Sequence, residues 1–177
     1  MDYQNGVVER VEDADPLLAR AKRTIELIRD HGGTVGYVRV GFAAGEAPSG
    51  TMGRRIGREA AQTMFHADAP ATQIHGEVSP REGDIVVRKT RVGPFGTTDL
   101  DEQLRAKGVD TLILAGISTS GVVLSTVRDG HDRDYRLIVL ADLCADFEAD
   151  VHEFLIKRIF PRQAEVITSD DLPGLLR

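Results

Sequence analysis

Short apolar runs alternate with longer helical patterns along the chain, and few folds are compatible with this arrangement. The runs cover residues 34–40, 84–89, 111–115, 137–141 and 165–168. Such alternation predicts a parallel sheet with helices on both faces, and short, mainly apolar runs are typical of strands that are buried on both sides. We therefore predict an α/β fold, a three-layer α/β/α sandwich around a mostly parallel, doubly wound sheet.

The segments between the apolar runs carry helix start and stop signals. Asp15 and Pro16 are expected to begin the first helix, and the glycine pair at 32–33 to end it. Further helices are predicted from 97 or 98 to 107, from 117 to about 131, and over 150–160. Because 177 residues suffice for one hydrophobic core, we expect a single domain over residues 1–177.

Between residues 41 and 78 the alternating pattern is interrupted. Gly, Ala, Ser and Pro are abundant over 41–57, and only 58–66 is predicted as a helix. A long connection in a compact domain is usually functional, for example as a lid over a site, but a surface loop is an equally good interpretation. The arginines at 54, 55 and 58 either reach over a site to contact an anionic substrate or remain in solvent.

Composition excludes several classes of protein. The chain has one cysteine, so it cannot form an internal disulfide, and a reducing, cytoplasmic location is expected. Its net charge of -6 does not favour a basic surface that would bind nucleic acid. No apolar run approaches the roughly 18–20 residues that span a bilayer. We expect a small-molecule substrate as the partner, with neither nucleic acid nor membrane.

Polar and small residues follow the predicted strands at their carboxyl ends, where ligands of doubly wound sheets bind. They are Asp2 with Gln4 and Asn5, Lys89 with Arg91, and the glycine- and serine-rich turn at 116–121. Backbone N–H groups at a helix start can stabilise an anion. Each feature also has an ordinary structural interpretation: a solvated carboxylate, a lysine extended to water and a helix cap. Their convergence on one edge favours a site.

Three ordered segments carry a family resemblance. They are MDYQNG at the start, VVRKTRVGPFGTTDLDEQL in the middle, and LILAGISTSGVVLST followed by LIVLADLCAD. In this order they resemble the aspartate, lysine and nucleophile motifs of the isochorismatase superfamily of hydrolases, which includes nicotinamidases and N-carbamoylsarcosine amidase. The match extends over nearly the whole chain, and it implies the same α/β fold.

The resemblance implies roles for individual residues. Asp2 matches the catalytic aspartate and Lys89 the catalytic lysine, while the nearby Arg91 shares the Lys-x-Arg spacing of isochorismatases proper. The turn residues implied to bind substrate or an oxyanion are Ile117, Ser118, Gly121 and Val122, with a cis peptide expected at Ile117–Ser118. Phe42 and Phe95 are expected to form an apolar wall.

The sequence departs from the family at the nucleophile. The position of the family's cysteine is Val122, which offers no nucleophile, acid or base. Isochorismatases proper have glycine there and cleave a vinyl ether through protonation by the aspartate. The only thiol, Cys144, is interpreted as a small buried hydrophobe rather than a substitute nucleophile. The region after Val40 lacks the metal ligands of nicotinamidases, so neither metal nor cofactor is expected.

A second departure concerns the first strand. In the family the aspartate ends a central strand, but only Met1 precedes Asp2 here. Two interpretations are open: the start is trimmed relative to the family, or a shortened strand pairs near residues 3–8. A sheet without its innermost strand would expose the neighbouring edges.

Three functions are compatible with these features. The favoured one is a hydrolase for a small carbonyl-bearing or anionic molecule, with Asp2 as acid or base, Lys89 orienting it, and water replacing the cysteine. Lys89 favours the charged form of Asp2 and burial the neutral form, so its protonation state stays open. The alternatives are a non-catalytic small-molecule-binding member and an assembly subunit. The resemblance implies a homodimer or homotetramer.

Overall fold

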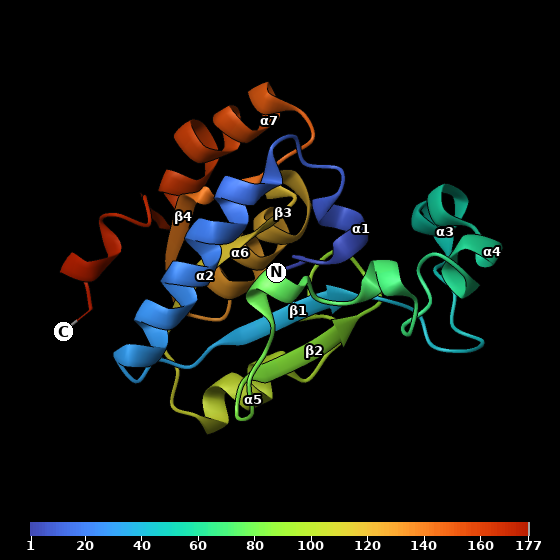
Figure 1. Ribbon diagram of the computed structural model, residues 1–177, viewed down its shortest axis with the longest axis horizontal. Helices are drawn as coiled ribbons and strands as arrows, with labels where there is room; N and C mark the ends of the chain where they lie inside the picture. The colour runs from blue at the N-terminus through green and yellow to red at the C-terminus, as the bar shows by residue number, and fades with distance from the viewer. Residues whose placement is uncertain (177) are drawn as a thin grey trace.

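The computed structural model describes residues 1–176 and contains parallel strands in two groups (Figure 1). In the first group β1 (Gly36–Val40) pairs with β2 (Ile85–Lys89). In the second, β4 lies between β3 and β5; their bounds are Thr111–Ile117 for β3, Arg136–Ala145 for β4 and Glu165–Ile167 for β5. All pairs are parallel, so the predicted strands and their orientation are confirmed, although the sheet is divided.

The first two residues lie between the two groups of strands. The Met1 amino group donates to the carbonyl of Ala115 at 2.9 Å, and the Ile117 amide donates to the Met1 carbonyl at 3.2 Å. On the other side, the Asp2 amide donates to the Val38 carbonyl at 2.8 Å. The chain then turns into helix α1 (Asn5–Val8), so the alternative of a strand pairing over residues 3–8 is wrong.

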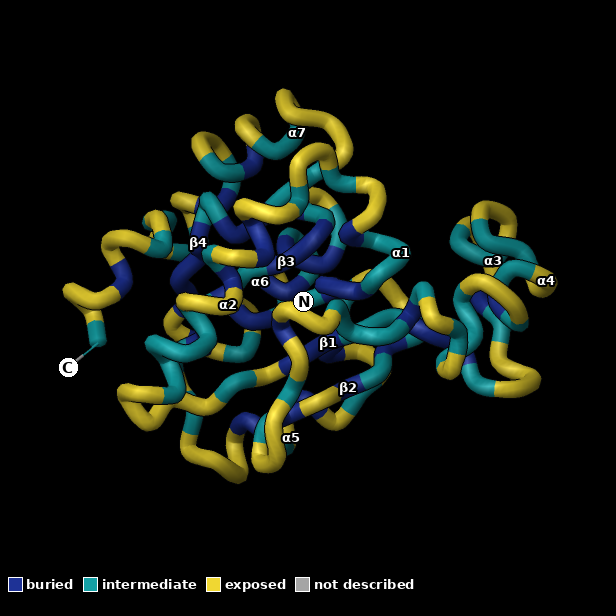
Figure 2. The backbone as a smooth tube through the Cα atoms, in the orientation of Figure 1, coloured by how far each residue is buried: buried dark blue, intermediate teal, exposed yellow. Residues whose placement is uncertain are grey.

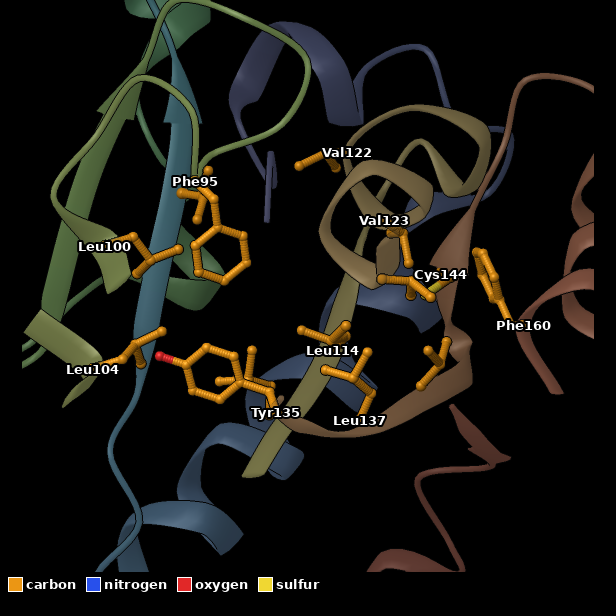
Figure 3. Close-up of a cluster of buried hydrophobic side chains, with 14 of the residues drawn as sticks. Phe95, Leu100, Leu104, Leu114, Val122, Val123, Tyr135, Leu137, Cys144 and Phe160 are labelled. Carbon is orange, nitrogen blue, oxygen red and sulfur yellow. The ribbon is translucent and has the colours of Figure 1, made fainter. Parts of the chain in front are cut away.

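Side chains of β4 alternate between two apolar layers. Ile138 and Leu140 pack with α2 (Ala14–Asp30), whereas Leu137 and Val139 belong to a cluster with α5 (Leu100–Ala106) and α6 (Leu124–His131). Figure 3 shows side chains of this second cluster. Helices therefore cover both faces of the strands, which is the expected three-layer arrangement.

The helices begin and end close to the predicted positions, with local differences. Helix α2 begins at Ala14 after Asp13, whose φ is 50°, so the expected cap Asp15 lies inside the first turn. The third helix opens with a wide π-helical turn, Thr119–Val123, before α6. The fourth is divided into α7 (Ala149–Phe154), a π-helical turn (Leu155–Ile159) and a 3-10 turn (Phe160–Arg162). Other 3-10 turns are Pro70–Thr72, Gly76–Val78 and Leu172–Gly174.

The long connection after β1 forms a lobe that projects from the sheet (Figures 1 and 2). It holds α3 (Gly50–Ile56), which was not predicted, and α4 (Arg58–Gln62), which is shorter than the predicted helix over 58–66. Phe42 anchors its base, since the Phe42 amide donates to the Phe65 carbonyl at 2.9 Å and its carbonyl accepts from Ala67 at 2.8 Å. Within residues 1–176, no helix is both long and apolar enough to cross a membrane.

Candidate active site

Asp2 and Lys89 form a buried ion pair. Lys89 is the last residue of β2, and its Nζ lies 2.8 Å from Oδ2 of Asp2. The side chain of Lys89 is 3% exposed, and that of Asp2 is 9% exposed. Asp2 has a positive φ of 55°, which lets the chain turn away from the strands directly after its amide has paired with Val38. The predicted convergence of these two residues at the carboxyl edge is confirmed.

The two carboxyl oxygens of Asp2 have different surroundings. Oδ2 accepts the Lys89 ammonium, whereas Oδ1 is buried and has no hydrogen-bond partner among the described residues. Burial raises the pKa of Asp2, and the opposing effect of Lys89 is smaller. The geometry therefore leaves Oδ1 as an oxygen that can hold a proton or accept one, while Lys89 fixes the orientation of the carboxyl group.

Gln4 secures the segment that carries Asp2. Its Nε2 donates to the carbonyls of Val40 and Thr72 at 2.8 and 2.7 Å, and its Oε1 accepts from the Val40 amide at 2.8 Å. Gln4 is 1% exposed, so each of these groups is satisfied inside the protein. The sequence grouped Gln4 with Asp2 without predicting this positioning function, because its partners come from distant parts of the chain.

The turn after β3 passes close to the start of the chain. The peptide bond between Ile117 and Ser118 is cis, as expected from the resemblance. At Gly116 an added Cβ would lie 2.8 Å from the Met1 carbonyl oxygen, so only glycine lets the first residue pass here. The turn therefore begins directly beside the residue that precedes Asp2.

Three amides of this turn already have acceptors. The Gly121 and Val123 amides donate to the Ser118 carbonyl at 3.2 and 3.3 Å, and the Ser120 amide donates to Oδ2 of Asp146 at 2.6 Å. An oxyanion would therefore have to use other N–H groups of the turn. The substrate-binding function of Ile117, Ser118, Gly121 and Val122 stays a prediction.

Val122 and Cys144 provide no nucleophile. Val122 is 2% exposed and belongs to the apolar cluster of Figure 3. Cys144 lies in β4 opposite Gly116, and burial raises the pKa of its thiol to about 12. A thiol with such a pKa is almost entirely protonated at neutral pH and hence a poor nucleophile. The interpretation of Cys144 as a buried, unreactive side chain agrees with this environment.

The remaining predicted residues have contacts of their own. Arg91 is exposed, and its guanidinium donates to the neighbouring Thr90 carbonyl at 2.7 Å. Phe95 is buried and stacks on Tyr135, with ring centroids 6.1 Å apart. Phe42 is fully buried at the base of the projecting lobe. Their participation in the site stays a prediction, as does that of the lobe arginines.

The structure also reveals a polar pair that the sequence did not indicate. Thr119 Oγ1 lies 2.8 Å from Nδ1 of His152, which comes from helix α7. Burial lowers the pKa of His152. This contact joins α7 to the turn after β3. Within residues 1–176, no group of three His, Cys, Asp or Glu side chains could hold a metal ion.

Comparison with known proteins agrees with this geometry. The isochorismatase domain model matches residues 1–171. An isochorismatase family protein of Bacillus subtilis is 30% identical over 171 residues, covering 97% of this chain and 88% of its own length. The maleamate amidohydrolase of Pseudomonas putida is 30% identical over 175 residues, covering 99% and 78%.

The fold has close counterparts among solved structures. The crystal structure of a cysteine hydrolase from Pseudomonas syringae superimposes with a TM-score of 0.86 at 25% identity, covering 99% of this chain and 89% of that one. The family match over 171 residues, the α/β architecture and the buried Asp2–Lys89 pair lead to the same assignment. The chain belongs to the isochorismatase family and is a hydrolase.

Proposed function

We propose that the protein hydrolyses a small carbonyl-bearing or anionic molecule, with Asp2 as acid and base, Lys89 as the orienting group and water as the nucleophile. The observation that carries this proposal is the asymmetry of Asp2. One oxygen is held by Lys89 at 2.8 Å, and the other is buried without a protein partner. A carboxyl group that is oriented through one oxygen presents its other oxygen, Oδ1, for proton transfer.

The proposed reaction needs one proton to move twice. Oδ1 of ionised Asp2 takes a proton from water while the water oxygen forms a bond to the carbonyl carbon. Backbone N–H groups of the turn after Ile117 stabilise the resulting oxyanion. Oδ1 then gives the proton to the leaving group as its bond to carbon breaks. A raised pKa suits this function, because proton transfer is most effective when the pKa approaches the working pH.

An amide-type substrate is supported by one relative, and attack by water is supported by the missing thiol. The Pseudomonas putida relative is a maleamate amidohydrolase, whose name denotes an amide substrate. With valine at position 122 and a protonated, buried Cys144, a covalent acyl-enzyme has no nucleophile at either position. Direct attack by water requires no such group.

The test is a panel of small amides, ureas and vinyl ethers assayed with the protein and with Asp2→Asn. Asp68→Asn is the matched control, because the Asp68 side chain is 90% exposed. Asp2→Asn should lower kcat by about 10²–10⁴-fold, the usual contribution of a general acid or base, while Asp68→Asn should leave it unchanged. Full turnover by Asp2→Asn would disprove the proposed function of Asp2.

A non-catalytic, ligand-binding function is the second candidate. It is favoured by Val122, which replaces the family's nucleophile with a buried apolar side chain. No turnover on the panel, together with a compound that raises the Tm, would support it. An assembly of two or four copies remains a proposal as well, and light scattering would test it directly.

A further inference from the structure

A groove of about 550 Å³ lies beside helix α1, and no residue of α3 or α4 lines it. Its apolar lining comes from α1, from the connection after α1 and from α2, and includes Val8, Val11 and Leu18. Glu9 and Asp15 line it as well. We call this space the α1 groove. Because it combines an apolar lining with carboxylates, it suits an occupant that is both apolar and positively charged.

The carboxylates around the α1 groove have no cationic partner. Residues 9–15 hold four exposed acidic side chains, those of Glu9, Glu12, Asp13 and Asp15. In the part of the chain that the structure describes, none of the four forms an ion pair. The one cation of this segment, Arg10, lies over the ring of Phe147, with its guanidinium carbon 4.1 Å from the centroid. The surface around the groove therefore keeps an excess of negative charge.

The projecting lobe, residues 42–69, carries the opposite charge. Its segment 50–58 contains three exposed arginines, at 54, 55 and 58, and no acidic residue. Arg54 donates to Thr51 Oγ1 at 2.9 Å, and within residues 1–176 none of the three arginines forms an ion pair. The lobe also presents apolar surface, because α3 has no buried residue and Met64 is 59% exposed. The lobe is therefore the kind of occupant that suits the α1 groove.

The base of the lobe holds it away from the α1 groove of its own chain. Arg88 of β2 donates to the Glu46 carboxylate at 2.7 Å and to the Gly41 carbonyl at 2.9 Å. Figures 1 and 2 show α3 and α4 standing clear of the body of the molecule, with α1 on the side of the body that faces them. Pro70 and Ala71, which line the groove, directly follow the lobe in the chain. Lobe and groove therefore lie on the same side of the molecule, but the lobe does not fill the groove beside it.

We propose that the α1 groove receives the lobe of a second copy of this chain, in a two-fold symmetric dimer in which the lobe of each copy lies in the groove of the other. The lobe arginines would face the carboxylates of residues 9–15, and the apolar surface of the lobe would lie against the apolar lining. Each chain has a net charge of -6, so two copies repel one another at long range and need such a local contact between opposite charges to associate. Because α1 begins directly after Gln4, a docked lobe would also brace the segment that carries Asp2.

The experiment reverses the charge of each surface and measures the association constant by analytical ultracentrifugation. The lobe-reversed chain carries glutamate at the three lobe arginines, as Arg54→Glu, Arg55→Glu and Arg58→Glu. The groove-reversed chain carries Glu9→Lys, Glu12→Lys and Asp15→Lys. The matched control changes the net charge as much as the lobe reversal does, at three exposed residues outside the lobe and the groove, as Arg23→Glu, Lys107→Glu and Arg162→Glu.

We expect the unsubstituted chain to dimerise and the control to dimerise within about tenfold of the same association constant. Each reversed chain alone should associate about 10²-fold more weakly, because its two contacts then join like charges. An equal mixture of the two reversed chains should regain association, since both contacts of the mixed dimer again join opposite charges. One chain that carries both reversals should dimerise with itself for the same reason.

Four results would overturn the proposal. They are an unsubstituted chain that stays monomeric at its highest soluble concentration, association that survives either reversal, an equal loss of association in the control, and a loss that neither the mixture nor the doubly reversed chain restores. If circular dichroism shows that one reversed chain is unfolded, the doubly reversed chain decides: a folded dimer supports the proposal, and a monomer or an unfolded chain contradicts it. None of these measurements depends on turnover, so the proposed dimer and the function proposed for Asp2 can fail separately.

Discussion

Asp2 and Lys89 form a polar pair on one side of the candidate site, whereas Val122, at the position of the family's cysteine, is packed among apolar side chains. The pair is held at 2.8 Å and leaves one carboxyl oxygen without a partner. Val122 is just as buried but offers no reactive atom. The contrast teaches that the pair proposed for proton transfer keeps one carboxyl oxygen available, while residue 122 offers no group for covalent catalysis. Chemistry in this protein should therefore depend strongly on the ion pair and weakly on residue 122.

Among the substitutions considered below, removal of Lys89 should lower turnover most. In Lys89→Met the pKa of Asp2 should rise further, because the ammonium that lowers it is lost. The acidic limb of the pH profile of kcat/KM should move to higher pH, and activity at pH 7 should fall at least 10²-fold. Lys22→Met, at a lysine that is 56% exposed, is the control. An unshifted pH profile would show that Lys89 does not orient or charge Asp2.

Substitution of Val122 should lower the stability of the fold while leaving turnover nearly unchanged. Val122→Ala creates a cavity in the core and should cost about 1–3 kcal/mol of unfolding free energy. Turnover should stay within about threefold, because water is the proposed nucleophile. Val127→Ala, at another fully buried valine of the same cluster, is the matched control for packing. A loss of turnover in Val122→Ala alone would mean that residue 122 shapes the reaction, contrary to the comparison above.

The Met1 amine should make stability depend on pH. Its pKa is lowered in the folded state from the ordinary value of 8.0, so the unfolded state binds more protons below that pH. Stability should therefore rise with pH up to about 8, by about 1.4 kcal/mol per unit between the two pKa values. Acetylation of the amine should remove this increment, as measured by urea unfolding from pH 5 to 8. Identical slopes for free and acetylated chains would contradict it.

Strand positions could be predicted from the sequence because buried parallel strands leave short apolar runs. The pairing of the strands could not be predicted, since nothing in the run 34–40 shows that β1 pairs with β2 alone among the strands of residues 1–176. Helix α3 was missed because Gly50 and Gly53 are poor helix formers. Its local hydrogen bonds include Gly53 to the Ser49 carbonyl at 3.0 Å.

The candidate site was predictable to the extent that it depends on strand ends. Lys89 could be placed at this edge because carboxyl ends of parallel strands share it. No predicted strand precedes Asp2, so it was the family motif that placed Asp2 beside Lys89. The contacts of Gln4 and the pairing of Thr119 with His152 could not be predicted. The latter joins residues 33 positions apart on separate elements, and no sequence pattern marks it.

Substitution of His152 should have the smallest effect on turnover. It tests the comparison between the two sides of the site, because His152 contacts Thr119 in the turn that carries Val122. Burial lowers its pKa in the folded state, so the unfolded state binds more protons below the ordinary value of 6.5, and stability should decrease as the pH falls from 7 to 5. His152→Gln should reduce this decrease, while His131→Gln, at an exposed histidine, should not.

Turnover at pH 7 should change less than tenfold, because His152 bonds Thr119 and not the Asp2–Lys89 pair. An equal loss of Tm on acidification in His152→Gln and in the unsubstituted protein would show that this histidine does not report on the turn. A loss of turnover as large as that of Lys89→Met would place the Thr119–His152 contact in the chemistry, and the two sides of the site would then have to be treated as one catalytic unit.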